Sequence, residues 1–258
     1  MSDRLSSARV ASAARPRLPD PATSGPYRPF ASDPGWSEAW WWLGLPVIAL
    51  ALLILINRFD PAFYAKWIIP EGYGVLEFSQ FATMLIALRL AIRLLFKPFV
   101  LTVSIIGALS CLYIAGEEMS WGQHFLHWNT PEYWAEVNRQ QETNLHNTYA
   151  VFDKYPRAVL ELGVLIGGII IPIAAMFDPR VRANRLSLFL PPSALLPVSV
   201  AAMGVKLADM GFQKGYMGEL MQRPSETIES LLYVFILAYL VVFARRIREI
   251  EREGAARA

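Results

Sequence analysis

Two adjacent glutamates and two histidines lie in the segment GEEMSWGQHFLHW, residues 116–128, directly after an uncharged apolar run. Carboxylates and neutral imidazoles are ligands for zinc- or iron-like ions, and the same groups exchange protons in acid–base catalysis. A second segment, QETNLHN at 141–147, adds one more carboxylate and the third histidine. Every histidine of the chain therefore lies within a span of 23 residues, beside a pair of carboxylates.

These residue types predict a divalent transition metal, zinc- or iron-like, held by Glu117, Glu118, His127 and His146. Glu142 and Glu77 are the candidates for a catalytic general base. No complete metal signature is present, because the chain lacks both HExxH and the Glu-x-x-His of di-iron bundles.

Other polar and aromatic residues are candidates for the same site. A helix continuing past Gly116 would place residues 117, 121, 124 and 128 on one face. A plainer interpretation stays open, in which the aromatic residues around His127 form an interfacial belt and the histidines only accompany them. The further candidates are Gln80, Trp121, Gln123, His124, Asn144, Asn147, Glu161, Glu226, Glu229 and Tyr233.

Carboxylates also occur inside the apolar runs themselves. Glu77 lies about one turn inside its run, Glu161 lies in another, and Glu226, Glu229 and Tyr233 follow one face of the last. An ionised carboxylate at membrane depth costs on the order of 2.5–3.5 kcal/mol unless it has a partner. Four expected helices thus bring a carboxylate toward one membrane surface, which predicts a shared polar site there.

The elements that would position these residues are membrane-spanning helices. The chain has 258 residues, of which 54% are hydrophobic and 18% charged, and its apolar residues cluster in runs near the ~20 that a helical span requires. We expect an all-α, polytopic membrane bundle of about six helices. The expected spans are 40–56, 74–96, 99–116, 158–177, 186–205 and 226–244. Pro191, Pro192 and Pro197 predict a kinked or partly unwound helix in the fifth.

The distribution of basic residues predicts the orientation. With an even number of spans, the tail, the turn near Lys97, the 178–185 loop and the C-terminus lie on one side, and they hold 16 of the 24 Lys and Arg residues. The positive-inside rule places that side in the cytoplasm. We therefore expect a disordered cytoplasmic tail at 1–35, a six-helix domain at 36–248 with an extracytoplasmic loop at 117–157, and a charged cytoplasmic tail at 249–258.

The motifs GEEMSWGQ at 116–123 and QETNLHN at 141–147, with Glu71 and Glu77 upstream, resemble a family of functionally uncharacterised bacterial inner-membrane proteins. The resemblance covers about residues 70–150. It implies a multi-pass protein of the bacterial inner membrane and no particular activity. Members of that family often carry Arg where this chain has His124, so the resemblance favours His146 as a ligand.

Three functions are compatible with these features. The first is a metal-assisted enzyme acting on a lipid or lipid-linked substrate at the outer membrane surface. The second is a proton- or cation-coupled transporter that uses the carboxylates as relays. The third is a structural or assembly partner in a membrane complex. Membrane lipids are the expected partners. The net charge of +2 and the absence of a basic patch argue against nucleic acid, and protein partners are left open.

Overall fold

The chain folds into a bundle of long helices, and no strand occurs among its described residues. The computed structural model describes residues 30, 32–34, 36–182, 186–214 and 221–256, so most of the expected tail at 1–35 lies outside them. The helices in chain order are α1 Trp36–Phe59, α2 Pro61–Phe63, π-helix η1 Tyr64–Ile68, α3 Val75–Leu94, η2 Pro98–Val100, α4 Leu101–Glu118, η3 Ser120–Gly122, α5 Gln123–Leu126, α6 Glu132–Val137, α7 Ala150–Gly163, π-helix η4 Val164–Ile170, α8 Ile171–Phe177, α9 Pro179–Arg182, η5 Ser193–Leu195, α10 Leu196–Gln213 and α11 Pro224–Ala256.

Within the described residues, five helical segments are long and apolar enough to cross a bilayer, and a bent pair makes a sixth if it counts as one span. The bent pair is Gly44–Phe59 with Pro61–Ile68, which turns by 113°. The predicted all-α class is therefore confirmed, and five to six of the described helical segments could span a membrane. The five straight segments are Val75–Leu94, Pro98–Glu118, Ala150–Phe177, Ser193–Gln213 and Pro224–Ala256.

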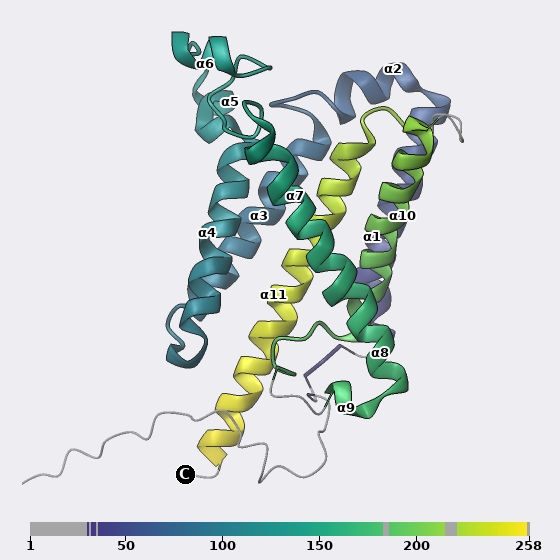
Figure 1. The fold of residues 1–258 in the computed structure, drawn as a ribbon, viewed down its shortest axis with the longest axis vertical. Helices are drawn as coiled ribbons and strands as arrows, with labels where there is room; N and C mark the ends of the chain where they lie inside the picture. The colour runs from purple at the N-terminus through teal and green to yellow at the C-terminus, as the bar shows by residue number, and fades with distance from the viewer. Residues whose placement is uncertain (1–29, 31, 35, 183–185, 215–220, 257–258) are drawn as a thin grey trace, which may run out of the picture.

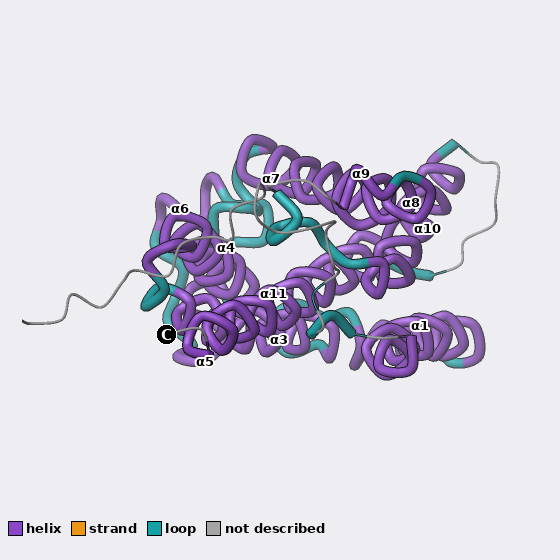
Figure 2. The backbone as a smooth tube through the Cα atoms, turned by 90° about the horizontal axis from the view of Figure 1, so that it is seen from below, coloured by secondary structure: helices purple, strands orange, loops and turns teal. Residues whose placement is uncertain are grey.

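The helix α11 is the centre of the bundle. It contacts α3 on one side and α10 on the other, and Figures 1 and 2 show it running between them. Its side chains Leu232, Phe243 and Ile247 are almost completely buried. Large apolar residues such as Ile106 and Leu109 on α4 are exposed instead, as expected for a surface that faces lipid.

Two spans begin elsewhere than predicted. The fourth begins at Ala150 and not at 158, because α7, η4 and α8 follow one another without a break. The fifth begins at Ser193, since residues 186–192 form turns before it. Pro197 falls in the first turn of α10, where the missing N–H is tolerated. The predicted span is therefore unwound at 186–192, where Pro191 and Pro192 lie, whereas Pro197 starts α10 and does not kink it.

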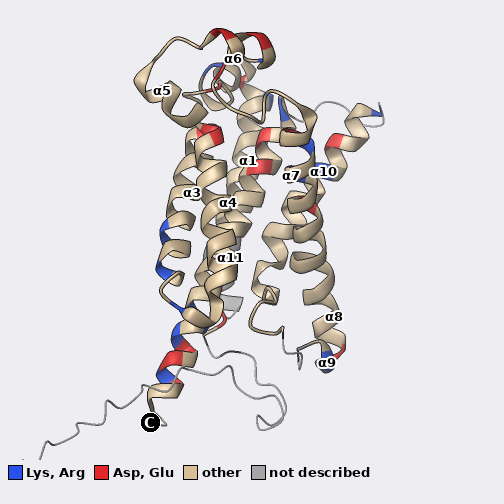
Figure 3. Ribbon diagram, turned by 60° about the vertical axis from the view of Figure 1, so that its left-hand side comes forward, with Lys and Arg blue, Asp and Glu red and all other residues tan. Residues whose placement is uncertain are grey.

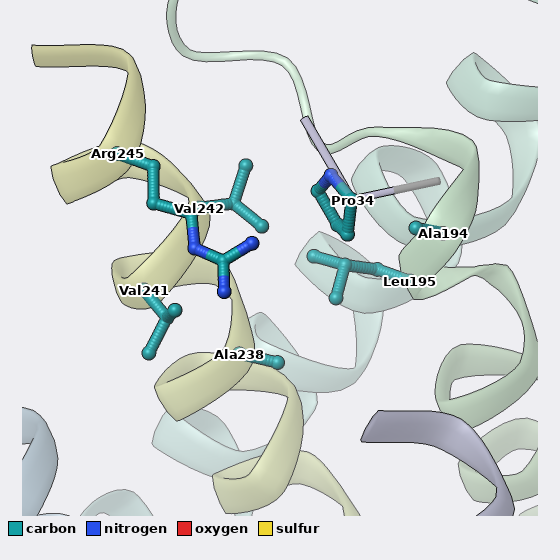
Figure 4. Close-up of a pocket in the computed structure, with 7 residues that line it drawn as sticks. All are labelled: Pro34, Ala194, Leu195, Ala238, Val241, Val242 and Arg245. Atoms are coloured by element: carbon teal, nitrogen blue, oxygen red, sulfur yellow. The ribbon is translucent and has the colours of Figure 1, made fainter. Parts of the chain in front are cut away.

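The described ends of the chain meet at the end of the bundle opposite α5 and α6 (Figure 1). The buried Arg246 of α11 binds the Asp33 carboxylate through Nε and Nη2, at 2.6 and 2.8 Å. Beside it, Pro34, Leu195 and Arg245 line a cavity of about 10 Å³ (Figure 4). That volume is near the minimum for one water molecule, so this cavity is too small for a substrate. The helix α11 continues to Ala256, so residues 249–256 are helical.

Candidate functional site

The polar segment after α4 leaves the helix and does not extend it. The helix ends at Glu118, and the next residues include Ser120, Trp121 and Gly122 with φ of 45°, 54° and 104°. The single turn α5, Gln123–Leu126, follows, and its C-cap residue His127 also has a positive φ. The face expected for a continuing helix therefore does not form. The chain instead folds back over the end of α4.

Glu117 anchors this end of the bundle. Its side chain is about 4% exposed, and its Oε2 accepts hydrogen bonds from the backbone N–H groups of Leu145 and His146, both at 2.7 Å. The His146 Nδ1 lies 3.2 Å from the same oxygen, and Trp121 Nε1 donates to Oε1 at 2.6 Å. Both carboxylate oxygens are therefore engaged in holding the loop before α7.

A second cluster lies on the other face of the loop. The hydroxyl of Ser120 donates to Glu142 Oε2 at 2.8 Å and accepts from Asn144 Nδ2 at 2.9 Å. His124 Nε2 lies 3.0 Å from the Ser120 oxygen and 3.4 Å from Glu142 Oε1. Because the hydroxyl proton goes to Glu142, His124 Nε2 must be the donor to Ser120.

The remaining ring nitrogen of His124, Nδ1, lies against the turn before α3. Nδ1 faces Gly72, whose missing side chain leaves room for the ring. No described residue hydrogen-bonds to this nitrogen. Ser120 is fully buried and donates to a carboxylate, so this arrangement is not a serine–histidine nucleophile pair. With the proton on Nε2, Nδ1 is the nitrogen that can accept a proton in neutral His124.

Asparagine and glutamine side chains hold the loops in place. Asn138 Nδ2 donates to Asn144 Oδ1 at 2.7 Å, and Asn147 donates to Gln140 Oε1. Gln123 bridges the two segments, since its Oε1 accepts from the Thr143 backbone N–H at 2.7 Å. The candidates Gln123, Asn144 and Asn147 therefore form the frame of the site.

An open cavity of about 490 Å³ lies between these loops and the turn before α3. We call it the outer cavity. It is lined by residues 71–73, by residues 140–142, and by four residues of the GEEMSWGQHFLHW segment, namely Gln123, His124, His127 and Trp128. Its volume lies in the range of pockets that bind small molecules. The cavity beside Arg245 is too small to bind one.

The His124–Glu142 pair is electrostatically matched. The hydrogen bond to Glu142 raises the pKa of His124 above its usual value, against the effect of burial. Burial would raise the pKa of Glu142, but hydrogen bonds to His124 and Ser120 outweigh it and hold that pKa below its usual value. The charged forms of His124 and Glu142 therefore stabilise each other.

This pair predicts a bell-shaped dependence of stability on pH. Glu142 contributes stability above pH 4.5 that is lost as the pH falls through its lowered pKa. His124 contributes stability below pH 6.5 that is lost as the pH rises through its raised pKa. We expect His124→Asn to lower the melting temperature most between these values, by about 2–4 °C for each ~1 kcal/mol lost. Thermal unfolding of wild type and His124→Asn from pH 4 to 9 measures this difference in melting temperature. A difference that does not change with pH would contradict the prediction.

Gly72 predicts a second effect. A Cβ at this residue would lie 2.8–2.9 Å from Cε1 and Cγ of the His124 ring, and its φ of +81° strains any L side chain. We expect Gly72→Ala to lower the free energy of unfolding by about 1–3 kcal/mol and to remove the bell-shaped pH dependence of stability. Gly122→Ala is the matched control, because its φ is +104° but its Cβ would only touch Trp128 at 3.5 Å. If Gly72→Ala and Gly122→Ala changed the pH dependence of stability equally, this placement of His124 would be contradicted.

The membrane-depth carboxylates approach one another, but most have separate partners. Glu118 accepts from the Tyr233 hydroxyl at 2.8 Å, and Arg157 Nη1 binds Glu229 at 2.6 Å. Glu161 pairs with Lys206 at 3.0 Å. Figure 3 shows acidic residues at the α5–α6 end of the helices. The predicted gathering of carboxylates therefore exists as a set of ion pairs and hydrogen bonds.

The first turns of α3 and α11 meet beneath the outer cavity. Gln80 Nε2 donates to the Glu226 carbonyl at 2.9 Å, whereas its buried Oε1 has no hydrogen-bond partner among the described residues. Arg223 Nη2 binds the carboxylates of Glu226 and Glu71, at 2.8 and 2.6 Å. Glu77 accepts from the Gly72 backbone N–H, so it holds the turn that carries Gly72.

The four predicted metal ligands are divided between different surroundings. Glu117 and His146 touch each other, Glu118 binds Tyr233, and His127 lines the outer cavity. The described residues contain no group of three or more His, Cys, Asp or Glu side chains placed to hold a metal ion. These residues therefore do not form a ready ligand set, and the metal stays a prediction.

Sequence reasoning missed several residues of the site. Ser120 joins His124 to Glu142, and Tyr73 lines the outer cavity. Arg157 and Arg223 provide the countercharges of the carboxylates. The two arginines had a visible signal, because a carboxylate at membrane depth requires a cation or donor nearby. Ser120 had none, since only the reversal of the chain brings it to Glu142.

Comparison with family models, with curated proteins and with solved structures finds no match to this chain. Any function of the outer cavity must therefore be inferred from its geometry alone. The resemblance of the GEEMSWGQ and QETNLHN motifs stays a prediction.

Proposed function

We propose that this chain is a multi-pass protein of the bacterial inner membrane whose outer cavity opens on the extracytoplasmic side. The clustering of Lys and Arg at the ends of the spans opposite GEEMSWGQHFLHW supports this orientation. Both termini then lie in the cytoplasm. The meeting of the described chain ends at the end of the bundle away from the cavity agrees with it.

The protein is, on this proposal, an enzyme that acts on the polar head of a lipid or lipid-linked substrate. The observation that carries the proposal is the His124–Glu142 pair in the wall of a cavity of about 490 Å³. His124 exchanges a proton with the substrate through Nδ1, and Glu142 favours the imidazolium form that results. Glu77 positions the Gly72 turn beside the imidazole.

The surroundings of the outer cavity fit an amphiphilic substrate. Tyr73 lines the cavity, and Phe125 and Leu126 lie in the chain between its lining residues His124 and His127; the three expose 50–74% of their surface. Aromatic and apolar side chains at the end of a span favour the boundary between headgroups and acyl chains. A lipid could therefore place its head in the cavity while its chains remain in the membrane.

A turnover experiment tests this proposal. The protein in lipid nanodiscs is incubated with a bacterial lipid extract, and the lipids are compared by mass spectrometry before and after. Wild type should deplete at least one lipid class, and His124→Asn should lower the rate by about 10²–10⁴-fold, as for loss of a general acid or base. Glu132→Gln, on the exposed part of α6, should match wild type. Equal turnover by His124→Asn and wild type would contradict the role of His124.

The same preparation tests the predicted metal. Elemental analysis of purified wild type and His146→Ala should show a stoichiometric transition metal in the first and a loss in the second, if Glu117 and His146 rearrange to bind one. Metal-free wild type that still turns over lipid would remove the metal from the proposal and leave His124 in place.

A transporter is the second candidate, because carboxylates within the spans lie close together. Glu118 is 7% exposed, and Glu229, Glu226 and Glu77 are the carboxylates near enough to act on it electrostatically. Proteoliposomes loaded with a pH-sensitive dye distinguish this function. A proton flux that Glu118→Gln abolishes and His124→Asn leaves intact would favour transport over catalysis.

A further inference from the structure

The charges on the wall of the outer cavity point to the kind of headgroup it takes. Its described lining includes two carboxylates, Glu71 and Glu142, and neither Lys nor Arg. Arg223 reaches Glu71, at 2.6 Å, but is not among the lining residues. An anionic group entering the cavity would therefore meet two carboxylates, of which Glu142 is paired with the His124 imidazole and Glu71 with Arg223. A cationic group would meet two hydrogen-bond acceptors.

Each of these carboxylates has one oxygen with spare hydrogen-bonding capacity. Glu142 Oε2 accepts from Ser120 and Asn144, both at 2.8 Å, whereas Oε1 has only the longer 3.4 Å contact with His124. Glu71 Oε1 accepts from Gln140 and Arg223, whereas no described residue donates to Oε2. A carboxylate oxygen has two lone pairs, so both sites can accept further N–H donors.

The two carboxylates also repel each other. Burial raises the pKa of Glu71 above its usual value, and the charge of Glu142 adds to this shift against the pull of Arg223. A cation between them would relieve the repulsion. Tyr73 and Trp128 line the same cavity, and aromatic rings within about 6 Å of a cation add to its binding.

We propose that the outer cavity binds a primary ammonium group, with Glu71 and Glu142 as its hydrogen-bond acceptors. This inference rests on the proposed function for its lipid source and names the substrate class as amine-bearing. A primary ammonium has three N–H donors to divide between the two carboxylates. A trimethylammonium group has no N–H donor, and a glycerol headgroup has neutral hydroxyl donors but no positive charge to offset its phosphate.

The test is a binding series on the full-length protein in detergent, followed by isothermal titration calorimetry. The probes are dihexanoyl phosphatidylethanolamine, phosphatidylcholine and phosphatidylglycerol, together with soluble glycerophosphoethanolamine. The ethanolamine lipid should bind at least about 10-fold more tightly than the other two lipids, since charged hydrogen bonds are lost with each of them. This headgroup series needs no variant.

Two variants locate the binding. Glu71→Gln should weaken binding of the ethanolamine lipid by about 10–100-fold. Glu132→Gln is the control with the same chemical change on the exposed helix α6, and it should bind as wild type does. Unchanged binding by a folded Glu71→Gln protein would contradict the assignment of this carboxylate.

The outcomes separate this inference from the proposed function. Equal affinity for glycerophosphoethanolamine and the ethanolamine lipid would keep the ammonium site and identify a soluble amine as its source. Preferred binding of phosphatidylglycerol, with turnover that needs His124, would overturn the ammonium assignment and leave the enzyme. No binding of any probe, together with no turnover in lipid extracts, would overturn both.

Discussion

Replacing Glu117 with alanine is expected to lower the free energy of unfolding by about 3–5 kcal/mol. The variant removes one nearly buried carboxylate and leaves three donors without their acceptor, namely the backbone N–H groups of Leu145 and His146 and the indole N–H of Trp121. Each buried unsatisfied donor costs about 1–3 kcal/mol. The loss should appear as a lower melting temperature and as faster hydrogen exchange in residues 138–148.

Glu132→Ala is the matched control for Glu117→Ala, because it removes an exposed carboxylate from the same loop region. Such a surface change should stay within about 0.5 kcal/mol. If both variants were equally stable, or if hydrogen exchange rose outside residues 138–148 and not within them, the anchoring role of Glu117 would be wrong.

Arg246→Ala is expected to have an effect of similar size at the opposite end of the bundle. The guanidinium is 3% exposed, and it binds Asp33 through two nitrogens and donates to the carbonyls of Ser187, Leu188 and Leu190. Removing one partner of a buried ion pair costs about 3–5 kcal/mol, because the other charge loses its countercharge. Arg246→Lys should recover only part of this, since an ammonium lacks the planar fork of five donors.

The neighbouring arginine provides the control for Arg246. Arg245 binds Glu38 at 2.7 Å, but both side chains are partly exposed and the pair faces solvent. Arg245→Ala should therefore cost about 0–1 kcal/mol. Thermal unfolding of the two alanine variants in one detergent measures the difference. Equal losses would show that Arg246 does not tie the segment before α1 to the 186–190 turn.

Much of the fold could be predicted from hydropathy alone, since a span must satisfy its backbone internally and face lipid with apolar side chains. Charged residues limited that prediction. Asp153 and Arg157 made the start of α7 look like a loop, although Arg157 lies on the side of the helix that pairs with Glu229. Proline was likewise ambiguous, because Pro197 fits a helix start as well as a kink.

The contacts within the candidate site could not be predicted from the sequence. The concentration of histidines and carboxylates predicted a shared polar site, and its function stays a prediction. Their partners depend on the reversal at Ser120 and Trp121, which are non-glycine residues with positive φ. A positive φ is rare for these residue types, so no local sequence pattern predicts the reversal. The sequence therefore indicated Glu117 as a metal ligand, whereas its oxygens hold the His146 loop.

The most direct test of the proposed function is photo-crosslinking from within the outer cavity in native membranes. A benzophenone amino acid replaces Gln141, which lines the cavity, and in a control it replaces Glu132 on exposed α6. After irradiation, intact mass spectrometry identifies any lipid attached to the protein. The proposal predicts a lipid adduct from position 141 and little or none from position 132. Equal labelling at both positions, or none at 141, would contradict a lipid headgroup site in the outer cavity.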